Sequence, residues 1–222
     1  MQFSLKAILI VLLSSCLWSC QNESTEQGDG AYKIDRALAK GSKEVKLDIV
    51  LSQVLWRGHR IALDGNRHRG SVKLESGNFL LKDGTLVGGK FAIDLNSLAV
   101  SDQEPGKGKE RLEGHLKGAD FFEVERYPTA QFEIADLIAI DSISGANHLV
   151  KGNLTIKGIT KPIEFPARIM IQGKVVSAVS LPFEINRTEW GVNYGSGLLG
   201  TIQDKIISDM IKLTVQARGE LD

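Results

Sequence analysis

Apolar and polar side chains alternate along most of the chain from residue 45 onward. Apolar positions fall first on the odd numbers of residues 45–51 and then on the even numbers of residues 54–56, so the parity changes near Ser52. A period of two is typical of a strand with one buried face, and a change of parity requires a bulge or a break. The alternation returns at residues 72–74, 79–81, 91–95, 154–156 and 211–217, which predicts further strands.

Turn signals separate these stretches. Asp83-Gly84 lies between two alternating stretches and predicts a tight hairpin. Further turns are expected at residues 144–147, 160–161 and 173. Helical character is confined to residues 102–118, where several glycines leave room for one short helix. About eight to ten short strands with almost no helix favour an antiparallel sandwich or barrel over βαβ units.

The middle of the chain, residues 111–134, is predicted to form an ordered corner. Tyr127-Pro128 requires extended backbone, because the residue before a proline is excluded from the helical region. Phe121 and Phe122 precede it and need apolar surroundings. We expect these rings to close one end of the sheet, or to wedge beneath it, with at least one of them buried.

The N-terminus has the pattern of an export signal. Lys6 precedes an apolar run at residues 7–13, which is too short to span a membrane. The ending Leu17-Trp18-Ser19-Cys20 is similar to the lipobox of bacterial lipoproteins. That resemblance implies a signal peptide at residues 1–19, cleavage before Cys20 and lipid attachment to Cys20. A plain secretory signal cut elsewhere is the alternative.

These features predict an exported, cell-envelope lipoprotein on the periplasmic side. Residues 20–30 are polar and read as a flexible tether between Cys20 and the folded domain. Gln21 stands where an Asp commonly retains such lipoproteins at the inner membrane, so the resemblance favours the outer membrane. The formal net charge of zero gives no sign of a nucleic-acid partner.

No catalytic signature is present. Residues 195–200 match the dinucleotide fingerprint G-x-G-x-x-G, but that motif requires a βαβ unit with further parallel strands, and only 22 residues follow it. The histidines His59, His68, His115 and His148 share no metal-ligand spacing, although a site assembled in space stays open. There is no nucleophile elbow and no phosphate-binding loop. We therefore expect no enzyme, no metal and no catalytic cofactor.

Several motifs in order resemble the YceI-like family. The fragments are VLWRG (54–58), HRGSVKLESG (68–77), LVGGKFAIDLNSL (86–98), HLKGADFFEVERYPTAQF (115–132), GNLTIKGITKPIEFPA (152–167) and INRTEWGVNYG (185–195). The resemblance implies an all-β fold over residues 31–222, a lipocalin-like antiparallel β-barrel of about eight strands with at most one or two short helices. It also implies non-catalytic binding of a long-chain isoprenoid or similar amphiphile, such as a quinone-type lipid, inside the barrel.

The alternation of apolar and polar residues along the strands indicates which side chains could line such a cavity. Inward-facing candidates are Val72, Leu74, Phe79, Leu81, Phe91, Ile93, Leu154 and Ile156. Candidates for a polar rim that receives a head group are His68, His115 and Arg187, because a guanidinium can bind phosphate with two parallel bonds. Arg187 could equally form a structural ion pair with Asp120 or Glu189.

Other functions stay open at this point. A barrel of this size can be filled by its own side chains, which would make the protein an interaction module with a solid core. An envelope lipid-modifying or hydrolytic enzyme would instead need a nucleophile–base pair or a metal cluster that converges on the cavity. The sequence does not indicate an oligomeric state.

Overall fold

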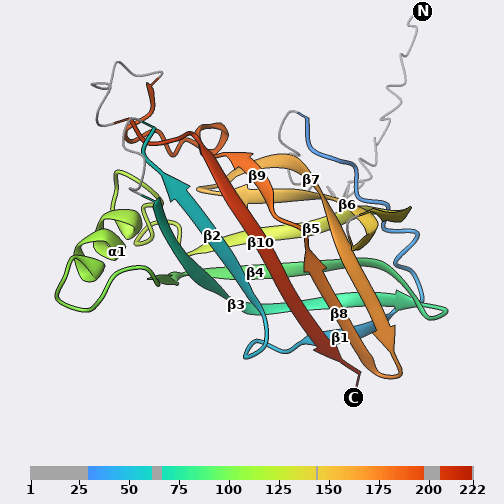
Figure 1. Cartoon of the computed structure of the whole chain (residues 1–222). Coiled ribbons are helices and arrows are strands. Elements are labelled where there is room, and N and C mark those ends of the chain that lie inside the picture. Colours follow the sequence, from blue (N-terminus) through green and yellow to red (C-terminus); the bar gives the residue numbers. More distant parts are fainter. Residues whose placement is uncertain (1–29, 62–66, 144, 198–205, 222) are drawn as a thin grey trace, which may run out of the picture.

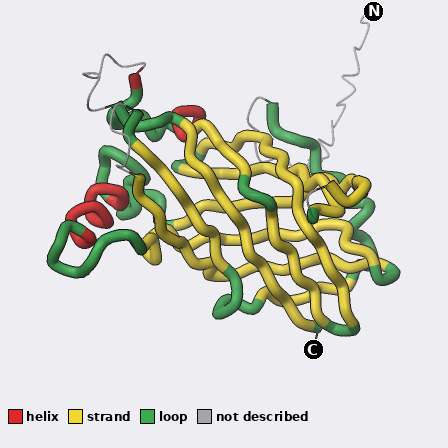
Figure 2. The backbone as a smooth tube through the Cα atoms, viewed as in Figure 1, coloured by secondary structure: helices red, strands yellow, loops and turns green. Residues whose placement is uncertain are grey.

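A computed structural model describes residues 30–61, 67–143, 145–197 and 206–221 (Figures 1 and 2). Within these residues the chain forms ten strands, one α-helix and one 3₁₀ helix. The strands are β1 (Lys43–Leu47), β2 (Gln53–His59), β3 (Arg67–Lys82), β4 (Thr85–Val100), β5 (Thr129–Ile143), β6 (Ala146–Ile156), β7 (Ile159–Gln172), β8 (Val175–Ser180), β9 (Phe183–Asn186) and β10 (Met210–Glu220). The helices are α1 (Lys109–Lys117) and η1 (Arg187–Trp190).

Eight of the strands close into a ring. Neighbours pair antiparallel from β10 through β2 and on to β8, and β8 pairs back with β10, so that Ala217 lies opposite Ala178. The strand β1 adds to β3 and β10, and β9 adds to β10. The prediction of an all-β antiparallel barrel of about eight strands with at most one or two short helices is confirmed.

Tight turns join the strands, with one correction to the sequence analysis. The Asp83-Gly84 turn has positive φ angles of 50° and 78°, as the predicted hairpin requires. The β6–β7 turn was expected at residues 160–161, and that prediction is wrong. The turn is at Lys157-Gly158, with φ angles of 50° and 74°, because a glycine takes positive φ without the strain that β-branched Thr160 would incur.

The change of parity near Ser52 is a break between two strands. The strand β1 ends at Leu47, and the carboxylate of Asp48 accepts the backbone N–H of Val50 at 3.0 Å and of Leu51 at 3.1 Å. The chain then re-enters the sheet as β2. Ser52 is buried, and its hydroxyl accepts the Arg218 N–H at 3.0 Å, which fixes the new strand against β10.

The two ends of the barrel differ. At the end that we call the α1 end, α1 and the corner after it lie beside the last residues of β2 and β4 and the first residues of β3 and β10 (Figure 1). The hairpins at residues 82–85 and 172–175 lie at the opposite end. There Val45, Leu81 and Val176 are buried in one apolar cluster, so this end is packed solid.

The N-terminal segment is fastened to the outside of β6. The Asn153 side chain accepts the Tyr32 N–H at 2.8 Å and donates to the Tyr32 carbonyl at 2.8 Å. Asn153 is only 7% exposed, so this pair of bonds is well protected from water. The predicted signal peptide, Cys20 and residues 21–29 of the predicted tether lie outside the described residues.

Candidate ligand-binding cavity

The ring encloses a cavity of about 740 Å³. Every strand of the ring contributes to its wall, and along β10 the alternate residues Ile211, Leu213, Val215 and Ala217 all face it. The wall consists mainly of Val, Ile, Leu, Phe and Ala side chains. A volume of this size lies within the range of small-molecule binding pockets, so the centre of the barrel is open although its far end is packed.

The structure places seven of the eight cavity candidates on this wall. They are Val72, Leu74, Phe79, Phe91, Ile93, Leu154 and Ile156. Leu81 also points inward and is buried, but it belongs to the packed far end and does not line the cavity. Leu81 lies next to the β3–β4 hairpin, opposite Leu86.

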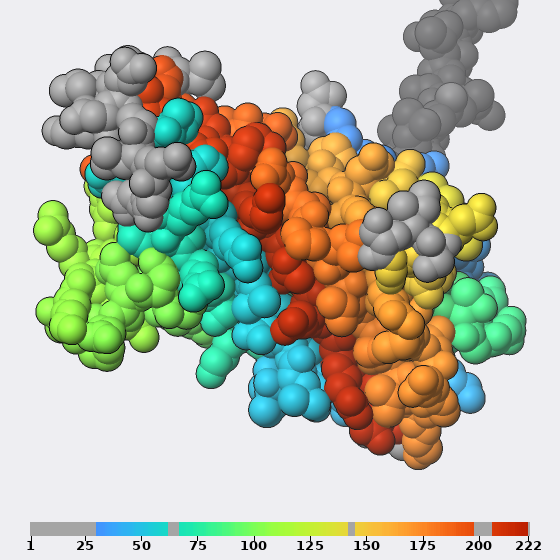
Figure 3. Space-filling model, viewed as in Figure 1, coloured from blue at the N-terminus to red at the C-terminus, as the bar shows by residue number. Residues whose placement is uncertain are grey.

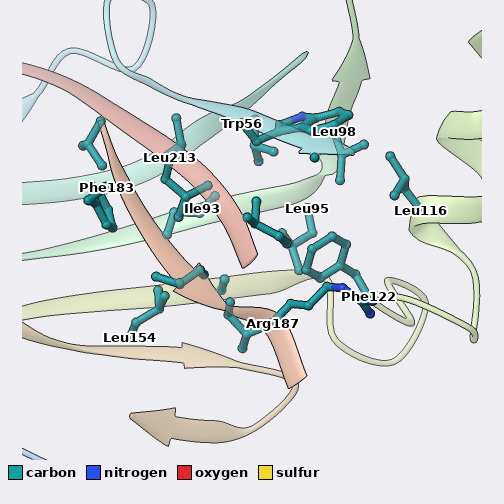
Figure 4. A pocket seen from close by; sticks show the side chains of 18 of the residues that line it. Trp56, Ile93, Leu95, Leu98, Leu116, Phe122, Leu154, Phe183, Arg187 and Leu213 are labelled. Carbon is teal, nitrogen blue, oxygen red and sulfur yellow. The ribbon is translucent and has the colours of Figure 1, made fainter. Parts of the chain in front are cut away.

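Further wall residues were not nominated from the sequence. Leu95 continues the parity of Ile93, and Trp56 continues that of Val54, so simple extension of the alternation would have found both. Phe165 and Phe183 come from β7 and β9, and their rings stack with centroids 4.4 Å apart. Figure 4 shows Phe183, Leu154 and Ile93 on one side of the cavity and Leu98, Leu116 and Phe122 toward α1.

Aromatic side chains of the corner form part of the wall at the α1 end. Phe121 is 5% exposed and Phe122 is half-buried, and both line the cavity. The His115 ring meets Phe121 and Tyr194 edge-on, with centroid distances of 5.1 and 4.6 Å. The expectation that the two phenylalanines cover one end of the barrel agrees with this arrangement.

Polar and basic side chains gather at the same end and form the mouth of the cavity. The mouth residues are His59, Arg60, His68, Lys107, Arg111, His115 and Tyr194. Most of them are exposed, while His68 and His115 are half-buried. No Asp or Glu among the described residues lines the cavity; Lys107 is paired with Glu104 at 2.6 Å, and Arg60 and Arg111 give the mouth its cationic character.

Two of the three rim candidates belong to this mouth. The His68 Nδ1 lies 2.9 Å from the Asp102 carboxylate, which also accepts the Arg69 N–H at 2.9 Å. Burial alone would raise the pKa of Asp102, but the Arg69 N–H and His68 lower it, so the pKa lies below its usual value. The His115 Nδ1 lies 3.8 Å from the Asp120 carboxylate.

The third rim candidate, Arg187, is held from within the protein. Its side chain is 2% exposed and its guanidinium donates to the carbonyls of Ser208, Val192 and Ile207. It also pairs with the Asp209 carboxylate at 3.1 Å, and not with either of the partners considered from the sequence. Burial lowers the pKa of Arg187, and Asp209 partly offsets that effect. Arg187 therefore touches the cavity but has most of its donors occupied.

Two buried polar atoms on the cavity wall have no hydrogen-bond partner among the described residues. They are the Trp56 Nε1, a donor, and the Gln103 Oε1, an acceptor. A buried polar group without a partner costs free energy. These two atoms could therefore bond to a polar group of a ligand.

Two features are absent from the described residues. These residues contain no group of three or more His, Cys, Asp or Glu side chains that could hold a metal ion. They also contain no helix with the length and apolar character needed to cross a membrane.

A closed ring of antiparallel strands around an apolar cavity makes this protein a β-barrel with an internal cavity. The sequence profile of the YceI-like domain matches residues 32–218, so the chain belongs to the YceI-like family. It is 34% identical over 84 residues to a UPF0312 protein of Pseudomonas aeruginosa, covering 38% of each chain. It is 30% identical over 105 residues to a UPF0312 protein of Pseudomonas putida, covering 47% of this chain and 50% of that one. The aligned part thus spans half or less of these curated relatives.

Two solved structures share the fold. BcnA of Burkholderia cenocepacia aligns with a TM-score of 0.58 and 20% identity, covering 78% of this chain and 99% of that one. A polyisoprenoid-binding domain from Saccharophagus degradans aligns with a TM-score of 0.55 and 14% identity, covering 80% and 98%. At these identities the likeness establishes the barrel architecture.

Proposed function

We propose that this protein binds a long-chain isoprenoid or a similar amphiphile inside its barrel, as a non-catalytic carrier or store in the bacterial cell envelope. The observation that carries the proposal is the cavity of about 740 Å³ walled by apolar side chains from all eight ring strands. Each methylene transferred from water to such a wall gains about 0.8 kcal/mol. A flexible hydrocarbon tail is the ligand that uses this surface best.

The orientation of the ligand follows from the two ends of the barrel. The far end is packed around Val45 and Val176, each 0% exposed, and offers nothing to a polar group. The α1 end carries the cationic mouth and the unpartnered atoms of Trp56 and Gln103. We infer that the tail lies in the barrel and that the polar head lies at the mouth.

The chemical identity of the tail rests on family membership. One structural relative is a polyisoprenoid-binding domain. An isoprenoid also suits a wall that mixes branched aliphatic side chains with phenylalanine rings, because branched chains pack closely against such surfaces. Quinone-type lipids share this tail and belong to the same proposal.

The proposed location follows from the sequence alone. Cys20 ends a lipobox-like segment, and Gln21 follows it. We propose that a lipid on Cys20 holds the barrel at the membrane on the periplasmic side, with the outer membrane favoured.

The test is to identify what the protein carries. The protein is purified from its own host, extracted with organic solvent, and the extract is analysed by mass spectrometry. We expect a long-chain amphiphile in a near-equimolar amount. The delipidated protein should then rebind a fluorescent isoprenoid. An extract free of long-chain lipid, together with no rebinding, would contradict the proposal.

A further inference from the structure

A second hollow of about 460 Å³ lies on the outside of the barrel. We call it the basic groove. Its lining residues are Arg57, Gly58, His59, Arg67, His68, Arg69, Asp102, Glu184, Met210 and Lys212. They come from β2, β3, β9 and β10 and from the segment after β4, which are distant in the sequence and meet only through strand pairing. Figure 3 shows this face, with β2 and β3 in cyan and teal beside red β10.

Strand register sets like charges directly against one another in this groove. Lys212 of β10 lies opposite Arg57 of β2, and Arg57 lies opposite Arg69 of β3. Like charges at directly opposed positions destabilise a sheet. Three cations in a row across three strands are therefore an arrangement that gains from a negatively charged partner.

The acidic residues of the groove neutralise this row only at Lys212. Glu184 pairs with Lys212 at 3.3 Å, and Asp102 accepts from His68 and from the backbone of Arg69. The guanidinium groups of Arg57 and Arg69 make no ion pair with any of the described residues. Both side chains are exposed. With Lys212 paired to Glu184, the directly opposed Arg57 and Arg69 leave this part of the groove short of negative charge.

The groove also leads to the cavity. Gly58, His59 and His68 line both the groove and the mouth. A surface that covered the groove would thus come up to the rim through which a ligand enters.

Exposed apolar side chains accompany the charges at this end of the barrel. Met210 lies in the groove and is 40% exposed, Ile61 follows the mouth residue Arg60 and is 64% exposed, and Tyr194 of the mouth is 45% exposed. Basic side chains combined with exposed apolar and aromatic ones are typical of surfaces that bind the interface of an anionic bilayer. A soluble polyanion would use the charges but would leave the apolar side chains in water.

We propose that the basic groove docks on a bilayer containing anionic phospholipid, which brings the cavity mouth to the membrane surface. The docking contact stands independently of the lipid that the cavity holds. Its role in loading or unloading the barrel rests on the proposed function.

The test uses the full chain carrying Cys20→Ser, so that no lipid anchor contributes. Binding is measured by flotation with vesicles of phosphatidylcholine alone and of phosphatidylcholine mixed with phosphatidylglycerol. We expect binding to the mixed vesicles only, and weaker binding as salt is raised. The double change Arg57→Gln and Arg69→Gln should weaken the partition coefficient about 30-fold, from about 1 kcal/mol for each basic side chain near an anionic surface.

The matched control is the double change Arg168→Gln and Lys174→Gln, which removes two exposed cations from the outer face of β7 and the hairpin at the far end. It should leave vesicle binding unchanged. Equal binding to both vesicle types, or equal losses in the two double variants, would overturn the proposal. A soluble polyanion such as dextran sulfate provides a further test. Complete competition by this polyanion would also overturn the proposal if substitutions of Met210 and Ile61 left vesicle binding unchanged.

A separate measurement distinguishes failure of docking from failure of the proposed function. Arg57 and Arg69 do not line the cavity. Binding of a fluorescent isoprenoid in solution, without vesicles, should therefore be the same in the groove variant and in the parent chain.

Discussion

The ring of Phe132 on β5 lies across the backbone of Gly152 on β6, so closely that a Cβ at Gly152 would overlap the ring atoms Cζ and Cε2. A Cβ there would also come within 2.6 Å of the Glu133 carbonyl oxygen. Phe132 lines the cavity, and its neighbour Phe165 lies 5.7 Å away between ring centroids. The absence of a side chain at Gly152 therefore sets the position of an aromatic part of the cavity wall.

Gly152→Ala should displace the Phe132 ring and destabilise the barrel. Forcing an extra methyl group into a packed site costs about 1–3 kcal/mol. The matched control is Gly58→Ala, also in a strand, where a Cβ would meet no atom within 4 Å. We expect urea unfolding to show a lower midpoint for Gly152→Ala and an unchanged or slightly higher one for Gly58→Ala. Equal midpoints would show that the Phe132 ring moves without cost.

Leu74→Trp should reduce the binding of a long isoprenoid while the barrel stays folded. Leu74 is 4% exposed and lies on the cavity wall, so a larger side chain there occupies ligand space. Titration with a fluorescent isoprenoid measures the affinity, and circular dichroism checks the fold.

The control for this change is Val179→Trp. Val179 is 43% exposed on β8, next to the cavity-lining residues Ala178 and Ser180, and so faces outward. This variant should bind like the parent chain. A folded Leu74→Trp variant that binds as tightly as its control would remove Leu74 from the ligand site.

Arg187→Met should lower the free energy of unfolding by about 3–5 kcal/mol, the range found when one partner of a buried charge pair is removed. The change leaves the Asp209 carboxylate without its ion pair and the carbonyls of Val192 and Ser208 without their donor. The control is Arg126→Met, whose side chain is 70% exposed and 3.7 Å from Glu123. Exposed pairs contribute about 0–1 kcal/mol, so chemical denaturation should separate the two variants clearly. If they unfold alike, the Arg187 contacts contribute no net stability.

Phe121→Ala should cost more stability than Phe122→Ala. Phe121 is 5% exposed, and its ring packs against His115, Tyr194 and the Arg187 guanidinium. Truncation of a buried phenylalanine typically costs about 3–5 kcal/mol, and the half-buried Phe122 should cost less. Denaturant midpoints of both variants test this order. Two midpoints equal to that of the parent chain would show that the corner is not packed as described.

Cys20→Ser should release the protein from membranes into the soluble fraction of its host, because the change removes the predicted lipid attachment site. Fractionation after a high-salt wash measures this and also removes contacts made by the basic groove. For the parent chain, a density gradient should place the protein with the outer membrane. A variant that remains in the washed membranes would contradict the lipobox prediction.

The side of the sheet on which a residue lies was predictable from the sequence, but its depth along the barrel was not. Alternation is a local property, so Val72, Leu74 and Ile93 were assigned to the inward face from their neighbours alone. Leu81 shares that face, yet it lies in the packed far end next to the β3–β4 hairpin, and alternation carries no information on that depth.

The environment of charged side chains depends on partners that are remote in the sequence. Three of the four partners of Arg187 are residues 207–209, which approach it because β9 pairs with β10, and the fourth is Val192, five residues further along the chain. Arg57, Arg69 and Lys212 likewise become neighbours only when β2 lies between β3 and β10. The spacing of residues within one segment indicates neither arrangement. The sequence pattern could therefore identify Arg187 as a candidate site residue, but it could not identify the partners of Arg187.

The pair of hydrogen bonds between Tyr32 and Asn153 determines the side of the barrel at which a membrane-anchored N-terminal segment would attach. Those bonds hold the chain on β6, and β6 stands across the ring from β2, four strands away in either direction. In a chain lipidated at Cys20, the twelve steps to Tyr32 reach at most about 43 Å. The barrel would then be attached to the bilayer in two places. The lipid anchor would hold the β6 side permanently, and the basic groove would bind on the β2 side in a reversible, salt-sensitive way. If the basic groove dissociated from the bilayer, the mouth would turn toward the aqueous space, while the lipid on Cys20 would keep the protein at its membrane.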